Sequence, residues 1–216
     1  MLDGFTTRRG QRTLRRSASQ LALLVVVALA LSAWHVLPGM ANRTLLTWPH
    51  GVIRVYDATG MHAAVRTAEA RWTDSGAHVH FVPVAREHDA DVVVRTNDHK
   101  LLKLCGRDCL GYTSAIGRPA SGHTEVLLRS ALGGPPRPLS VWVAAHELGH
   151  VLGLRHRPGR DCSLMSPRAF DTRCAPSLAA SPPTPAELAC VPAPGDVERA
   201  AKLYGGAPVS DDPRCR

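Results

Sequence analysis

The sequence predicts a single α+β domain that follows a basic and apolar N-terminal segment. Short runs typical of strands precede the longest helical pattern of the chain, and a second helical pattern lies near the C-terminus. Of the 216 residues, 44% are hydrophobic and 20% are charged, which is ordinary for a globular protein. This length and composition exclude a wholly disordered chain and a multi-span membrane protein, and they leave room for one domain with a short appendage.

The predicted domain covers residues 51–207 and follows a short polar linker over residues 42–50. Residues 51–57 alternate apolar and polar side chains, which predicts a strand that Thr59–Gly60 ends. Apolar residues at helical spacing predict a helix over 61–72. Further runs predict strands over 78–84, 90–96, 110–116 and 125–129.

The longest helical pattern follows a loop over residues 135–140. Ser140 is a typical N-cap residue, and apolar positions continue at helical spacing up to Leu152. Gly153 is expected to end this helix, as glycine often does. A final helix is expected over 196–204, with two glycines after it and a tail over residues 208–216.

The N-terminal segment predicts export from the cytoplasm. Five arginines lie in a basic leader over residues 1–20, and the apolar run Leu21–Ala33 follows. This order is typical of a secretory signal, and the positive-inside rule places the rest of the chain outside. Residues 21–41 form either a cleaved signal peptide or an uncleaved membrane anchor over residues 21–37, and both alternatives stay open. We expect an extracellular domain, secreted or anchored.

The formal net charge of +8 does not indicate a nucleic-acid partner. Only three of the 26 basic residues are lysines, and the N-terminal arginines account for most of the excess. No basic stripe with interleaved aromatic residues occurs. We therefore expect no nucleic acid among the partners, and we expect a monomer.

The cysteines agree with export, because an even number of cysteines in an exported chain is typical of disulfides. All lie beyond the apolar run, at Cys105, Cys109, Cys162, Cys174, Cys190 and Cys215. The first two are close enough to close a small loop with each other, and the sequence leaves the other pairings open. A cysteine-based metal site is the alternative, but no pair with CxxC spacing occurs.

The stretch over residues 146–156 predicts a metal site. Residues four apart lie on one face of a helix, so His146 and His150 can present both imidazoles to one ion. Gly153 permits the positive φ that would turn the chain back and bring His156 to the same ion. Because three protein ligands and a water are typical of catalytic zinc, we expect one catalytic Zn²⁺. A surface helix whose histidines make only hydrogen bonds is the alternative.

Glu147 is the candidate general base. It projects about 100° around the helix from His146 and can reach the open side of the metal. Zn²⁺ lowers the pKa of its water to about 7, so the carboxylate can take a proton from that water. The hydroxide can then attack a peptide carbonyl, and Glu147 would carry the proton to the departing amine.

The string HELGHVLGLRH, residues 146–156, resembles the zinc-binding motif of the metzincin clan of metalloendopeptidases. The chain looks most like the matrixin-type branch, over about residues 48–207. The residues outside the motif that support this are Trp72, Phe81, 90–94, 111–112, 125–128, 196–197 and 203–205. The resemblance implies a metzincin-like zincin fold, with a small twisted mixed sheet, a long active-site helix and a C-terminal helix.

The same resemblance implies further site residues. Met165, within Cys162–Pro167, would form the turn beneath the zinc, and Pro167 would line the pocket for the residue after the scissile bond. An extended substrate would pair by strand addition with Leu110, Gly111, Tyr112 and Thr113. We expect disulfides in the region over 157–195 to brace the turn. Whether the chain also binds a structural Ca²⁺ or a second Zn²⁺ stays open. The sequence contains no ligand loop that matches such a site.

The leading interpretation is a zinc metalloendopeptidase that acts on protein or peptide substrates outside the cell. One alternative is a zinc-binding pseudoenzyme that holds peptides without cleaving them, although the presence of Glu147 argues against it. Another is a hydrolase of a non-peptide amide, for example in the cell wall.

Overall fold

A five-stranded mixed sheet organises the computed structural model, which describes residues 46–157, 163–167 and 191–209. Its order is β2-β1-β3-β5-β4, and all neighbours pair in parallel except β4, which lies antiparallel to β5 at one edge. The predicted α+β fold with a small mixed sheet is therefore confirmed. The strands are β1 (Val52–Ala58), β2 (His80–Pro83), β3 (Val92–Thr96), β4 (Gly111–Thr113) and β5 (Thr124–Leu128).

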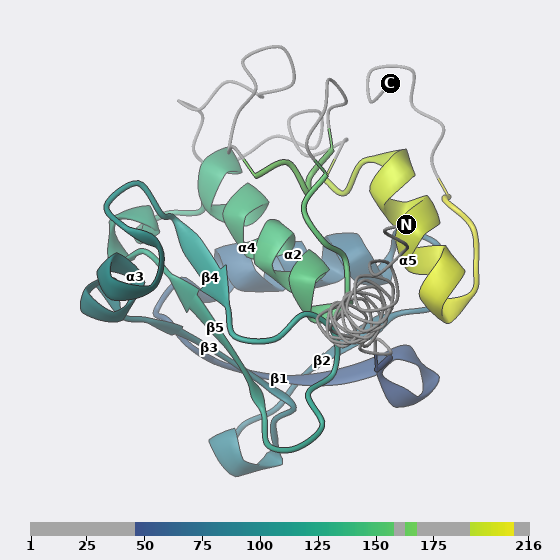
Figure 1. Ribbon diagram of the computed structural model, residues 1–216, viewed down its shortest axis with the longest axis horizontal. Helices are drawn as coiled ribbons and strands as arrows, with labels where there is room; N and C mark the ends of the chain where they lie inside the picture. The colour runs from purple at the N-terminus through teal and green to yellow at the C-terminus, as the bar shows by residue number, and fades with distance from the viewer. Residues whose placement is uncertain (1–45, 158–162, 168–190, 210–216) are drawn as a thin grey trace, which may run out of the picture. The chain divides into compact units, whose positions relative to one another are not determined.

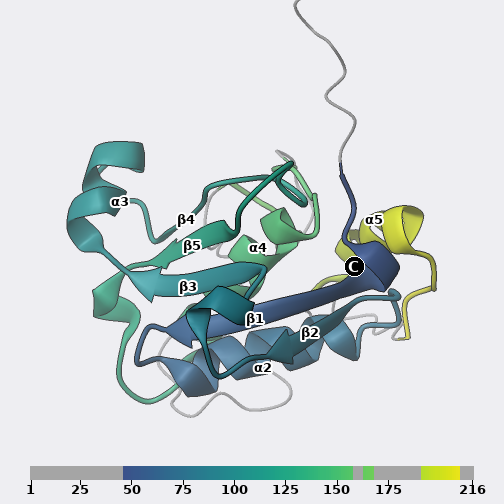
Figure 2. The same ribbon diagram turned by 90° about the horizontal axis from the view of Figure 1, so that it is seen from below.

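Two helices, α2 (His62–Thr73) and α4 (Pro138–Val151), cover one face of the sheet, and α5 (Pro194–Tyr204) lies beyond them (Figures 1 and 2). Helix α2 joins the parallel strands β1 and β2, as a crossover connection requires. The main core lies between this face and the two helices. It includes Ile53, Val55, Val92, Val94, Val126 and Leu128 from the strands and Val65, Trp72, Val141 and Leu148 from the helices.

Helix α3 (Asp98–Cys105) was not expected from the sequence. Its N-cap is Asn97, whose side-chain oxygen accepts a hydrogen bond from the Lys100 N–H at 2.9 Å. It contacts β4 and β5, and the loop after it is closed by a disulfide between Cys105 and Cys109. The structure thus confirms that these two cysteines pair with each other. The other four cysteines lie outside the described residues.

Helix α4 starts earlier than the sequence predicts, so the assignment of Ser140 as its N-cap is wrong. The helix begins at Pro138, whose fixed φ suits the first turn. Ser140 lies inside that turn, where its hydroxyl accepts a hydrogen bond from the Arg137 N–H at 3.0 Å. For the same reason α5 begins at Pro194 rather than at Asp196. At the other end of α4, Gly153 adopts φ 99°, the left-handed turn that the sequence predicts.

Four backbone carbonyls of α4 and the turn after it accept hydrogen bonds from distant parts of the chain. A helix leaves its last carbonyls without internal partners. Here the Gly117 N–H donates to the His150 carbonyl at 2.9 Å, and Trp48 Nε1 donates to the Val151 carbonyl at 2.8 Å. The Tyr204 hydroxyl donates to the Leu152 carbonyl at 3.0 Å, and Trp72 Nε1 bonds the Ala145 carbonyl at 2.9 Å. The bonds from Gly117, Trp48 and Tyr204 fix the end of α4 against three other parts of the domain, and the bond from Trp72 holds the middle of α4 against α2.

The expected bounds of the linker and of two strands differ from those in the structure. Trp48 belongs to the segment expected to be a linker, yet it is buried against the end of α4. The predicted strand over 110–116 is confined to Gly111–Thr113, and the one over 78–84 to His80–Pro83.

The signal-or-anchor segment lies outside the described residues. Within them, no helix is long and apolar enough to span a membrane.

Candidate metal centre

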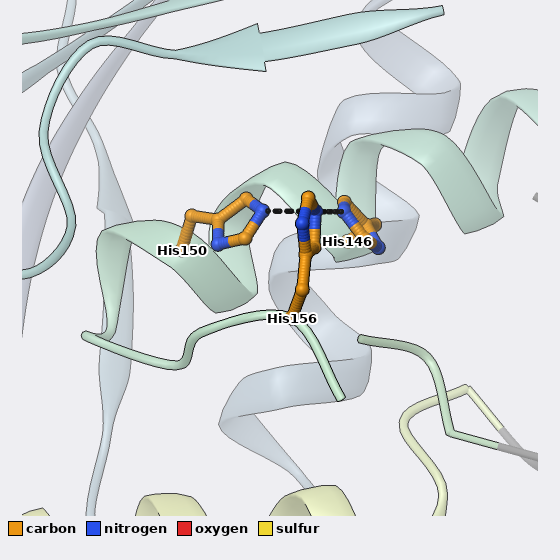
Figure 3. Close-up of side chains that lie close together, drawn as sticks. All are labelled: His146, His150 and His156. Carbon is orange, nitrogen blue, oxygen red and sulfur yellow. Dashed lines mark hydrogen bonds between the residues drawn. The ribbon is translucent and has the colours of Figure 1, made fainter. Parts of the chain in front are cut away.

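Three imidazoles converge at the C-terminal end of α4 (Figure 3). His146 and His150 lie one turn apart on the helix, and His156 reaches them after the turn at Gly153. The Nε2 atom of His156 lies 3.3 Å from Nε2 of His146 and 3.1 Å from Nε2 of His150. The structure therefore brings together all three ligands that the sequence predicts. Among the described residues, no other set of three histidines, cysteines or carboxylates lies so close together.

These separations suit a tetrahedral ion. Zn–N bonds of about 2.0–2.1 Å place the nitrogens of a tetrahedral site about 3.3–3.4 Å apart. The two Nε2 distances from His156, 3.3 and 3.1 Å, lie close to that value. Three imidazoles also form the donor set of catalytic zinc sites that keep a fourth position open. The residues present thus fit a Zn²⁺ ion.

Backbone carbonyls set the orientation of two of the rings. The Nδ1 atom of His146 lies 2.6 Å from the Leu164 carbonyl, and Nδ1 of His150 lies 2.7 Å from the Leu154 carbonyl. Because a carbonyl only accepts, each Nδ1 carries the proton and each Nε2 keeps its lone pair. Both rings are therefore held in the tautomer that a metal requires.

The environment keeps the three imidazoles neutral. Burial, with a smaller contribution from the neighbouring histidines, lowers the pKa of His146 to about 3 and that of His150 to about 4. Burial also lowers the pKa of His156, which is the most exposed of the three. At neutral pH all three nitrogens are free to bind a cation.

A turn with Leu164 and Met165 lies beneath α4. Met165 is fully buried, and a Cβ atom added to Gly149 would lie 2.4 Å from its Sδ atom. The absence of a side chain at Gly149 therefore makes room for the methionine. Met165 thus packs against α4, the helix that carries His146 and His150.

Asp196, at the start of α5, holds this turn. Its side chain is buried, and it accepts hydrogen bonds from the Leu164 N–H and the Ser163 hydroxyl, both at 2.6 Å. Leu164 thus joins Asp196 through its N–H and His146 through its carbonyl. The sequence did not predict this role of Asp196. Its carboxylate accepts a hydrogen bond from the backbone of Leu164, 32 residues away, and no pattern of side chains indicates that the two residues are in contact.

Glu147 is a buried residue of α4 and lies beside the candidate metal ligands. Burial raises the pKa of its carboxyl group to about 7, and a hydrogen bond from the Thr113 hydroxyl to Oε2, at 2.7 Å, opposes this shift. A cation held by the histidines would favour the ionised form. A group that titrates near neutral pH can both accept and release a proton.

The histidines and Glu147 line a cleft of about 710 Å³. The edge strand β4 forms one side of the cleft, and within the described residues its outer edge has no partner strand, so it can pair with an extended peptide. All residues that the resemblance assigns to substrate binding line this cleft, namely Leu110, Gly111, Tyr112, Thr113 and Pro167.

Six further residues of the cleft were not expected from the sequence. Trp142 stacks on His146 with ring centroids 5.2 Å apart, and it lies four residues before it, a spacing that could have been noticed. The others, to which the sequence assigned no role in the cleft, are Asp108, Ile116, Val143, Arg155 and Ser166. Asp108 and Arg155 add two charged side chains to the walls of the cleft.

No protein-family model matches the chain, and no curated protein matches it. Among solved structures, that of myroilysin is similar, with 17% sequence identity and a TM-score of 0.37. The similarity covers 51% of this chain and 52% of that one, so the chain spans about half the length of this relative. The case for the site therefore rests on its own geometry.

Proposed function

We propose that the chain is a zinc-dependent metalloendopeptidase that acts outside the cytoplasm. The observation that carries the proposal is the convergence of three imidazoles beside a buried carboxyl group in a cleft bounded by a free strand edge. The basic and apolar N-terminal segment supports export. The resemblance of residues 146–156 to the metzincin motif supports zinc as the ion and a peptide bond as the substrate.

His146, His150 and His156 would hold the ion through their Nε2 atoms. Zn²⁺ bound there would polarise a substrate carbonyl and lower the pKa of a water. The Leu164 and Leu154 carbonyls keep the first two rings in the required tautomer before any ion arrives. A site prepared in this way needs little rearrangement on binding.

An extended peptide would lie along the free edge of β4. Backbone groups of Gly111, Tyr112 and Thr113 would hydrogen-bond it as an added strand, which fixes the scissile bond beside Glu147. Val143 and Pro167 line the cleft and offer apolar contacts for a substrate side chain. Binding along a strand edge favours unfolded or extended segments over folded ones.

Glu147 would move the proton. Its carboxylate would accept a proton from the attacking water and then donate it to the departing amine. Its burial suits this role, because desolvation raises its pKa to about 7 and so makes the carboxylate a stronger base. The residue would thus serve first as a base and then as an acid.

The test uses the full chain with its disulfides oxidised and its Glu147→Ala variant. Zinc per chain and cleavage of a mixed peptide library are measured with and without a chelator. We expect about one zinc per chain in both proteins, chelator-sensitive cleavage by the wild type, and no cleavage by the variant. Zinc binding without cleavage by the wild type would instead favour a peptide-holding pseudoenzyme. Cleavage of cell-wall amides but not of peptides would favour the other alternative.

A further inference from the structure

Strand β4 meets α4 at Glu147. Side chains of a strand alternate between its two sides, so Gly111 and Thr113 share one side and Tyr112 takes the other. A Cβ atom added to Gly111 would lie 2.5 Å from Oε1 of Glu147 and 2.8 Å from its Cγ. The Thr113 hydroxyl contacts the same side chain. Both residues on this side of the strand therefore enclose the carboxyl group.

The Thr113 hydroxyl lies close to two oxygens of Glu147. It lies 2.7 Å from the carboxylate Oε2 and 3.2 Å from the backbone carbonyl of the same residue. A hydroxyl has one hydrogen to donate, and the shorter distance directs it to the carboxylate. The Thr113 side chain is thus hydrogen-bonded to the tip of Glu147, which restricts the rotamers of that glutamate.

The second carboxylate oxygen, Oε1, differs from Oε2 in its contacts. Within the described residues, Oε1 of Glu147 receives no hydrogen bond, and Glu147 itself lines the cleft. Gly111 faces Oε1 without a side chain that could cover it. The Thr113 hydroxyl thus occupies one oxygen, and the absence of a side chain at Gly111 leaves room beside the other.

We propose that Thr113 is a positioning residue for Glu147, whose hydroxyl fixes Oε2 so that Oε1 faces the attacking water. The role rests on the proposed function and extends it, because the resemblance assigned Thr113 only to substrate pairing. Pairing with a substrate uses the backbone of the strand, so the side chain can hold Glu147 at the same time.

The first experiment separates the hydroxyl from the shape of the side chain. In the zinc-loaded full chain, Thr113→Val removes the hydroxyl at nearly constant volume, and Thr113→Ser keeps it. Because a misplaced catalytic group costs up to about a hundredfold, we expect the valine variant to lower kcat about tenfold or more. KM should stay within about twofold, and zinc per chain should be unchanged, because neither depends on the hydroxyl. The serine variant should restore most of kcat.

A matched control is available on the neighbouring strand. Thr124 of β5 is buried, and its Oγ1 has no hydrogen-bond partner among the described residues. Thr124→Val makes the same chemical change without touching Glu147, so kcat should stay at the wild-type value. A fall in kcat equal to that of Thr113→Val would overturn the positioning role.

A second readout does not depend on activity. Melting temperatures are measured in the presence of a chelator for Thr113→Val, Glu147→Ala and the double variant. If the two side chains contact each other, the double variant should melt at a higher temperature than the sum of the single shifts predicts. Additive shifts would overturn the contact, and a valine variant with wild-type kcat would overturn the positioning role alone. A wild type that cleaves no peptide would overturn this role together with the proposed function.

Discussion

Asp196 is linked to the candidate ligand His146 through a single residue, Leu164, and removing it tests whether that link supports the metal. Asp196→Ala deletes the acceptor of both the Leu164 N–H and the Ser163 hydroxyl. Hydrogen bonds to a charged group contribute about 1.5–3 kcal/mol each. Burial raises the pKa of Asp196, so part of this gain offsets the cost of burying the charge. We expect a net loss of about 2–4 kcal/mol in the free energy of unfolding.

For a domain of this size, each kcal/mol lowers the melting temperature by about 2–4 °C, so the variant should melt about 4–16 °C lower. Removing a residue that helps to orient a metal ligand also weakens metal binding by about 10- to 100-fold. Without Asp196, the Leu164 carbonyl no longer holds the His146 ring in place. Zinc affinity is measured by competition with a chromophoric chelator, and stability by thermal unfolding.

The control is Glu198→Ala, which removes an exposed carboxylate from the same helix. Glu198→Ala should change neither the zinc affinity nor the melting temperature. An Asp196→Ala variant that binds zinc as tightly as the wild type would refute the link through Leu164, even if its melting temperature fell.

Two other outcomes follow from the same region. Gly149→Ala should lower the melting temperature by about 2–12 °C, because its Cβ would lie 2.4 Å from the buried Met165 Sδ and overpacking costs about 1–3 kcal/mol; an unchanged thermal unfolding curve would contradict this packing. In chelator-treated protein, His146 and His150 should lower the stability as the pH drops from about 6.5 towards 4, because the unfolded chain protonates them while the folded chain, with pKa values of about 3 and 4, does not. The raised pKa of Glu147, about 7, opposes this effect over the same range, so the effect is measured by denaturant unfolding of Glu147→Ala, and constant stability of that variant would contradict it.

The metal ligands were predictable because their placement depends on local geometry. The spacing of His146 and His150 puts both on one helix face, and the left-handed turn at Gly153 is a property of that residue type. The strands were predictable in number and order along the chain for a similar reason. Their apolar residues alternate or cluster over short distances.

Other features depend on contacts that the sequence does not display. Helix α3 spans only eight residues and buries only Leu101, so it has too little periodicity to be recognised. The bond from Thr113 to Glu147 joins residues 34 apart, and that from Leu164 to Asp196 joins residues 32 apart. Neither pair has a spacing that a motif could encode. The start of α4 was misjudged because Pro138 competes with Ser140 for the first turn, and the fixed φ of proline decides it.

The hydrogen bonds that Trp48, Gly117 and Tyr204 make to the end of α4 have a consequence for the site without its metal. Helix ends ordinarily fray. Here the end that carries His150 can open only if contacts to three separate parts of the chain break together. We therefore expect this turn to exchange its amide hydrogens only on global unfolding, and His150 to stay in place when a chelator removes the ion.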